Sequence, residues 1–148
     1  MTSEPPFPAN TATDTEQPSA DAMLVLVDVR TGTHPGYDRV VLEFTGPGAP
    51  GWTASYAASA VRQGKGDPIT VAGGSILDIV VSGTAYPEGG TGGFPAGAQA
   101  SSGTVVKEVF NDGTFEGLTH VVIGTTGQQP FRVYAAQNPP RVIIDVQH

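Results

Sequence analysis

The sequence contains no cysteine and no long apolar run. Without cysteine, the chain has no disulfide framework, no thiolate metal site and no cysteine nucleophile. Without an apolar run long enough to cross a bilayer, it has no candidate membrane span. No secretory signal peptide is recognisable at its start, and the polar stretch after Met1 fits a trimmed mature form.

Basic side chains are scarce as well. The chain has 7 Lys and Arg residues against 14 Asp and Glu residues, which gives a formal net charge of −7. No basic patch is visible, and binding to phosphate backbones needs clustered Lys and Arg. Nucleic acid and anionic lipid surfaces are therefore not expected as partners.

Glycine and proline are abundant instead, with 20 and 13 residues among 148, and only 14% of the residues are charged. Such a composition favours many short strands joined by tight turns, and helix formers at helical spacing are few. The length suits one domain and a tail. We expect an all-β fold.

Residues 1–22 are rich in Pro, Thr, Ser, Ala and acidic residues and contain one aromatic residue, Phe7. They bury too little apolar area to offset the entropy of ordering, so we predict a disordered N-terminal tail. Its functional interpretation is a tether that holds the domain of residues 23–148 off a membrane, with a lipid anchor upstream. The alternative is a flexible terminus without a role.

The domain shows repeated apolar alternation of period 2, which is typical of strands. Strands are predicted over residues 23–30, 38–45, 52–56, 75–82, 104–110, 114–124, 131–135 and 141–146, and weaker ones over 60–63 and 69–71. Asn111, Asp112 and Gly113 predict a hairpin turn. Residues 83–103 form a long glycine-rich loop, and long loops are often functional, so Tyr86 and Phe94 are candidates for a lid.

Motifs for catalysis or cofactor binding fail on their context. Residues 46–51 match the glycine pattern of dinucleotide sites, but two prolines remove amide donors and a strand follows instead of a helix. The three histidines lack metal-ligand spacing. The serines lack a nucleophile elbow, and nothing selects two of the acidic residues Asp78, Glu108, Asp112 and Glu116 as a glycosidase pair. We expect neither an enzyme nor a cofactor nor a metal site.

Four charged residues stand inside strongly apolar strands, namely Arg39, Arg132, Arg141 and Asp145. Period-2 alternation allows such residues to face away from the core. One interpretation is a polar outer face with ion pairs that contribute little to stability. The other is a binding face flanked by Tyr37 and Tyr134. An internal ion-pair network is a third possibility.

Residues 37–44 and 139–146 resemble the opening and closing strands of the AMIN domain, the amidase N-terminal module. The wider sequence is similar to the AMIN-like domain of actinobacterial secreted proteins and lipoproteins. The matching motifs are Asp28-Val29-Arg30, residues 34–39, Phe115-Glu116-Gly117, Gly124, Phe131-Arg132-Val133 and the final strand up to His148. The resemblance implies a small β-sandwich of two antiparallel sheets and a non-catalytic role in targeting envelope proteins to peptidoglycan or associated glycans.

We therefore expect an extracytoplasmic module, secreted or tethered as a lipoprotein, that binds a cell-wall glycan. Aromatic rings would cover sugar faces, and arginine forks would bind carboxylates. The expected ligand-binding residues are Tyr37, Asp38, Arg39, Arg132, Tyr134, Arg141 and Asp145. Two alternatives stay open: a protein-interaction module that docks an envelope enzyme or secretion component through a sheet edge or the long loop, and a carrier of an apolar ligand between the sheets.

Overall fold

The structure, a computed structural model, describes residues 10–87 and 93–148. Within these residues the chain forms twelve strands and no helix, and every paired strand is antiparallel to its neighbours. Over the same residues, then, no helix is long and apolar enough to cross a membrane.

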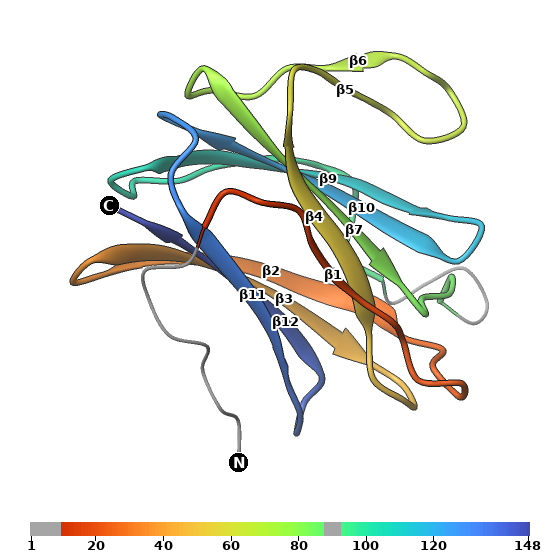
Figure 1. The fold of residues 1–148 in the computed structure, drawn as a ribbon. Helices are drawn as coiled ribbons and strands as arrows, with labels where there is room; N and C mark the ends of the chain where they lie inside the picture. Colours follow the sequence, from red (N-terminus) through yellow and green to blue (C-terminus); the bar gives the residue numbers. More distant parts are fainter. Residues whose placement is uncertain (1–9, 88–92) are drawn as a thin grey trace.

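Two sheets pack face to face (Figure 1). The six-stranded sheet has the order β1 (Asp14–Glu16), β4 (Gly51–Ala57), β7 (Ser75–Ser82), β10 (Leu118–Thr125), β9 (Val106–Phe115) and β8 (Gly97–Ala100). The four-stranded sheet has the order β11 (Phe131–Ala136), β12 (Arg141–Gln147), β3 (Tyr37–Thr45) and β2 (Val25–His34). The prediction of an all-β sandwich of two antiparallel sheets is confirmed.

The main core lies between the two sheets and follows from period-2 alternation. In β3, Val40, Leu42 and Phe44 are buried, whereas the residues between them are half-buried. The same alternation in β7 buries Leu77 and Ile79. One continuous cluster of buried apolar residues joins both sheets. Burial of apolar area at about 25 cal/mol per Å² makes this cluster the main source of stability.

A third, small sheet of β5 (Ala60–Val61) and β6 (Pro68–Ile69) lies on the far side of the six-stranded sheet from the four-stranded one (Figure 1). Ala60 and Ile69 form a separate apolar cluster with Val122 of β10. This excursion covers part of the outer face of the six-stranded sheet.

The structure corrects three details of the sequence interpretation. Residues 14–16 form β1, which pairs with β4, although residues 1–22 were expected to be disordered; residues 1–9 lie outside the described part. The predicted hairpin turn at residues 111–113 is a bulge within β9, because the pairing with β10 shifts there. The turn lies at Glu116 and Gly117, whose φ angles of 50° and 81° suit a two-residue hairpin. Part of the predicted loop over residues 83–103 forms β8.

Candidate functional site

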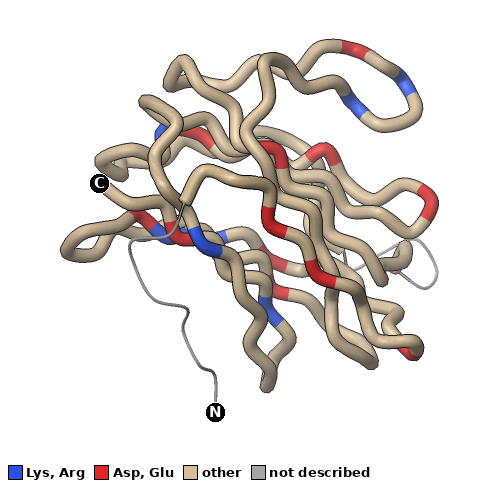
Figure 2. Tube along the Cα trace, in the orientation of Figure 1, with Lys and Arg blue, Asp and Glu red and all other residues tan. Residues whose placement is uncertain are grey.

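Three charged side chains form one row across the outer face of the four-stranded sheet. Asp145 of β12 stands opposite Arg39 of β3 on one side and opposite Arg132 of β11 on the other. Because directly paired residues point to the same face, this register brings the three side chains together. Basic residues are concentrated on this sheet: Figure 2 shows the charged positions, and four of the seven Lys and Arg residues lie in β2, β3, β11 and β12.

Asp145 connects the two arginines. Its Oδ1 accepts a hydrogen bond from Nε of Arg39 at 2.8 Å, and its Oδ2 accepts bonds from Nη2 of Arg39 at 3.0 Å and from Nε of Arg132 at 2.9 Å. Asp145 is 0% exposed and Arg132 is 7% exposed. A carboxylate that accepts two guanidinium groups at these distances fixes both of them, since fork-shaped donors constrain direction as well as distance.

Two tyrosines complete the arginine cluster, which we define as Tyr37, Arg39, Arg132, Tyr134 and Asp145. The hydroxyl of Tyr134 accepts a bond from Nη2 of Arg39 at 2.8 Å. The ring of Tyr37 lies 5.3 Å from the guanidinium carbon of Arg39 and 5.2 Å from that of Arg132. Cation–π contacts at such distances favour arginine stacked on an aromatic face. Tyr37 and Arg39 are half-buried, whereas the other three are buried.

The arrangement suits recognition of a polar ligand with an apolar face. Guanidinium groups donate hydrogen bonds and accept none, and tyrosine offers a flat apolar ring with a polar tip. The buried members hold Arg39 and Tyr37 in a set orientation, which lowers the entropy cost of binding. Sugars and peptide carboxylates are ligands of this chemical kind.

Asp38 and Arg141 were predicted as ligand-binding residues, but they lie apart from the arginine cluster. Asp38 is buried, and its Oδ2 accepts bonds from the backbone amides of Val105 and Val106 at 2.6 and 2.9 Å. Burial raises its pKa, but hydrogen bonds from Thr33 and the backbone outweigh that effect and lower the pKa below 3.8. Asp38 therefore connects β3 to the start of β9.

Arg141 stabilises its own hairpin. Its Nε donates to the carbonyl of Pro139 at 3.2 Å and its Nη2 to the carbonyl of Gln137 at 3.3 Å. Arg141 precedes Asp145 by four residues in β12, about 13 Å along a strand. Arg141 therefore lies on the same face of β12 as Asp145, but too far along the strand to join the arginine cluster.

The two candidate lid residues differ from each other. Phe94 packs against the main core, and its backbone amide donates to the carbonyl of Leu26 at 2.8 Å. Tyr86 is 59% exposed. Residues 88–92, between them, lie outside the described part of the chain. Phe94 is therefore an anchor of this segment, and Tyr86 is its exposed aromatic residue.

A pocket that the sequence interpretation missed lies beside the arginine cluster. It is lined by Arg30, Thr31, Gly32, His34, Arg39 and Val41 of β2 and β3. The ring of His34 stacks on that of Tyr37, with the centroids 5.0 Å apart and the planes 14° from parallel. The missed signal was the alternation of Arg30, Gly32 and His34 in one strand, which puts all three on one face.

A second polar cluster lies on the outer face of the six-stranded sheet. His120 is buried, and its two ring nitrogens contact Asp112 at 2.8 Å and Asp78 at 2.5 Å. Asp112 also accepts bonds from Nε of Arg62 at 3.0 Å and from the backbone amide of Gln63 at 2.7 Å. Because Arg62 and Gln63 directly follow β5, this cluster ties the β5–β6 excursion to the sheet.

The pKa values in this cluster follow from its geometry. Burial alone would lower the pKa of His120, but the bonds and charges of Asp78 and Asp112 outweigh it and raise the pKa above 6.5. Burial raises the pKa of Asp112, whereas bonds from Gln63, His120 and Arg62 lower it below 3.8 in total. In the part of the chain that the structure describes, this cluster included, no three His, Cys, Asp or Glu residues are placed to hold a metal ion.

Comparison with known proteins identifies the family of this chain. A family model, the AMIN-like domain, matches residues 24–148, which is most of the chain and the whole sandwich from β2 to β12. No curated protein and no solved structure matches the chain. The chain belongs to the AMIN-like domain family, whose members are generally non-catalytic, cell-wall-associated and extracytoplasmic modules.

Proposed function

We propose that the chain binds peptidoglycan or an associated cell-wall glycan through the outer face of its four-stranded sheet. The observation that carries the proposal is the arginine cluster, in which Asp145 fixes Arg39 and Arg132 against the ring of Tyr37. In the proposal the module acts outside the cytoplasm, either secreted or held by a lipid anchor upstream. Because residues 14–16 belong to the folded sheet, any tether lies before them.

Roles within the site follow from exposure. Arg39 and Tyr37 are half-buried and contact the ligand in this proposal, the arginine through its donors and the tyrosine through its ring. Arg132, Tyr134 and Asp145 are buried and act as positioning residues. The wall polymer supplies both kinds of partner, since it carries sugar rings and acidic groups.

Co-sedimentation with purified wall material tests the proposal. The folded chain is mixed with intact sacculi, with peptidoglycan stripped of attached polymers, and with an unrelated insoluble polysaccharide. We expect pelleting with stripped peptidoglycan and not with the unrelated polymer. No pelleting with either wall preparation rejects the proposal.

The variant Arg39→Lys identifies the face. Lysine retains the charge but lacks the planar fork, so we expect at least about tenfold weaker binding, which corresponds to about 1.4 kcal/mol. Arg62→Lys is the matched control, because Arg62 also donates, at 3.0 Å, to an aspartate whose side chain is 3% exposed, and also stacks on an aromatic ring, at 5.8 Å, but against the six-stranded sheet. Equal binding by the two variants contradicts the assignment of this face.

One observation favours a second function, docking of an envelope protein. β8 ends the six-stranded sheet, and three of its four residues are exposed, which is the form of an edge that accepts an added strand. Binding to a purified envelope protein in the absence of polymer, together with no binding to polymer, supports this alternative. Binding to purified polymer alone contradicts it.

A further inference from the structure

Gly32 lines the pocket between β2 and β3 without adding a side chain to it. Gly32 stands opposite Arg39, in a strand where every other residue of the same face carries a side chain. Its backbone does not require glycine, since a Cβ added there meets no atom within 4 Å and its φ is not positive. Glycine weakens a strand, and inside one it often marks close approach of a ligand. The pocket has a volume of about 200 Å³.

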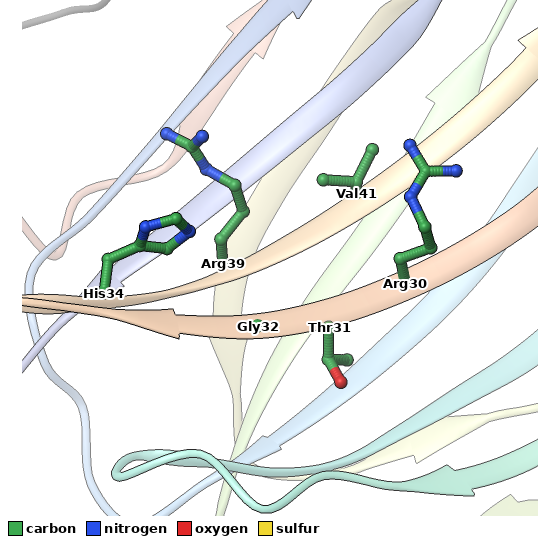
Figure 3. A pocket seen from close by; sticks show the side chains of 6 residues that line it. All are labelled: Arg30, Thr31, Gly32, His34, Arg39 and Val41. Atoms are coloured by element: carbon green, nitrogen blue, oxygen red, sulfur yellow. The ribbon is translucent and has the colours of Figure 1, made fainter.

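Two arginines, which only donate hydrogen bonds, line this pocket together with His34 and the apolar Val41. Arg30 and His34 precede and follow Gly32 by two residues, so alternation brings them to the same face of β2. Figure 3 shows Arg30, His34 and Arg39 rising on the same side of the sheet, whereas Thr31 points to the other side. Val41 lies between the two arginines and also lines the pocket (Figure 3).

Arg30 has donors to offer. Its Nη1 donates to Asp28 at 2.6 Å and to Glu43 at 2.8 Å. Its Nε and Nη2 make no hydrogen bond with the described residues, and the same holds for the ring nitrogens of His34. These groups are exposed, so they are available to a ligand.

We propose that this pocket binds an oxyanion, a carboxylate or a phosphate, of the wall polymer; the inference rests on the proposed function and names the ligand group that the same face recognises. Arginine donates without accepting, and its fork matches the oxygens of carboxylates and phosphates. The two carboxylates of Asp28 and Glu43 exceed the single charge of Arg30, so recognition at Arg30 depends on donor geometry and on the nearby charge of Arg39. The pocket adjoins the arginine cluster through Arg39 and the His34–Tyr37 stack, so one polymer chain can contact both.

Filling the pocket is the direct test. Gly32→Leu adds a side chain on the pocket face, at a position where a Cβ meets no atom within 4 Å, and leaves every donor residue in place. We expect at least about tenfold weaker binding to peptidoglycan, the loss of about one charge-assisted hydrogen bond. Thr53→Leu is the matched control, because it adds leucine at an exposed strand position on the other sheet. Circular dichroism and urea unfolding verify that both variants fold.

A second variant tests the donors in the opposite direction. Glu43→Gln removes a carboxylate that competes for Arg30, so we expect about threefold tighter binding, which is within what an exposed ion pair contributes. The double variant Gly32→Leu and Glu43→Gln should bind as weakly as Gly32→Leu alone, because the pocket stays filled. Unchanged affinity of Glu43→Gln together with unchanged affinity of Gly32→Leu overturns the inference.

Binding experiments with three different probes distinguish a carboxylate ligand from a phosphate ligand. The probes are peptidoglycan stripped of attached polymers, the same material with its stem-peptide carboxylates amidated, and a soluble glycerol-phosphate polymer. Loss of binding on amidation assigns the carboxylate, and competition by the glycerol-phosphate polymer assigns the phosphate. If the wild type binds amidated peptidoglycan as well as the unmodified form and the phosphate polymer does not compete, the inference fails while the proposed function stands. If the wild type binds no wall material, both fail.

Discussion

At the scale of single residues, Asp145 determines how the outer face of the four-stranded sheet is built. It is fully buried and accepts hydrogen bonds from two arginines. A buried ion pair contributes little net stability when it is complete, because desolvation costs about as much as the attraction returns, but removal of one partner leaves charge uncompensated. The complete cluster therefore adds little to the free energy of unfolding, whereas removal of the Asp145 carboxylate alone lowers that free energy strongly.

Asp145→Asn should destabilise the protein by about 3–5 kcal/mol, because Arg39 and Arg132 lose the negative charge that they share and one of its two accepting oxygens becomes an NH2 donor. Urea unfolding followed by circular dichroism measures the change. Asp28→Asn is the control, since Asp28 pairs with Arg30 at a position where the two side chains are 40% and 47% exposed, and it should cost less than about 1 kcal/mol. If both variants lower the free energy of unfolding by a similar, small amount, Asp145 does not hold the arginine cluster together.

Asp38, directly before Arg39, faces the opposite side of β3 and has a structural role. Asp38→Asn replaces an acceptor of the amides of Val105 and Val106 and should cost about 1–3 kcal/mol, the penalty of an unsatisfied buried donor. Binding of the folded variant to stripped peptidoglycan should equal that of the wild type. A loss of binding without a loss of stability would mean that Asp38 takes part in ligand binding, as the sequence analysis expected.

At the scale of elements, the β5–β6 excursion depends on the polar cluster of His120. The excursion is short, and its apolar contact consists of Ala60 and Ile69. The additional connection is polar: Arg62 and Gln63 bind Asp112, and Asp112 binds His120. Since His120 contacts two carboxylates, its charged form is the one that the folded state favours.

This arrangement predicts a pH dependence. The pKa of His120 is raised in the folded state, so its contribution is complete below the unfolded value of 6.5 and is lost as pH rises through the folded pKa. The pKa of Asp112 is lowered, so its contribution is present above 3.8 and is lost as pH falls through its folded pKa. The cluster contributes most between about pH 4 and 6.5.

His120→Gln should therefore destabilise the protein more at pH 5.5 than at pH 9, measured as the difference in urea unfolding free energy from the wild type. His34→Gln is the control, because His34 lies on the other sheet and stacks on Tyr37. Its effect should be small at both pH values. A larger effect of His120→Gln at the alkaline pH would mean that the folded state holds the neutral imidazole.

Much of the strand pattern could be predicted from the sequence, and the exceptions have physical reasons. Alternation located β3 and β7 to within a residue, because one face of each is buried. β1 has three polar residues and no apolar signal, and its existence depends on pairing with β4. The Asn-Asp-Gly sequence favours a turn, but Asp112 is held by His120 and Arg62 in the middle of β9, and a bulge results.

The site could be predicted in part for a similar reason. Alternation put Arg39 on the face away from Val40, Leu42 and Phe44, and it put Asp145 on one face with Arg141 and Ile143. It left open which face of β12 is buried, and it contains no information on which strands are neighbours. The row that they form with Arg132 depends on the order β11-β12-β3, a pairing of distant segments. Arg141 has the same local pattern as Asp145, yet it binds its own turn.

At the scale of the whole molecule, the candidate binding face and the net charge oppose each other. The chain carries −7, whereas the face that we propose for an acidic wall polymer carries four of its seven basic residues. The net charge repels such a polymer at long range, and the arginines attract it at short range. Ionic strength decides which effect is felt, because the screening length is about 30 Å at 0.01 M, about 8 Å at 0.15 M and about 3 Å at 1 M.

Binding to stripped peptidoglycan should therefore be strongest near 0.15 M salt and weaker at both 0.01 M and 1 M. At low salt the whole charge of the protein acts on the polymer, and at high salt the contacts of the arginines are screened. A triple variant, Glu16→Gln, Asp67→Asn and Glu116→Gln, removes three exposed acids away from the site and changes the net charge from −7 to −4. It should bind more tightly than the wild type at 0.01 M and equally at 1 M, as measured by co-sedimentation. A steady fall in wild-type binding from 0.01 M upward would mean that the local arginines outweigh the net charge at every distance.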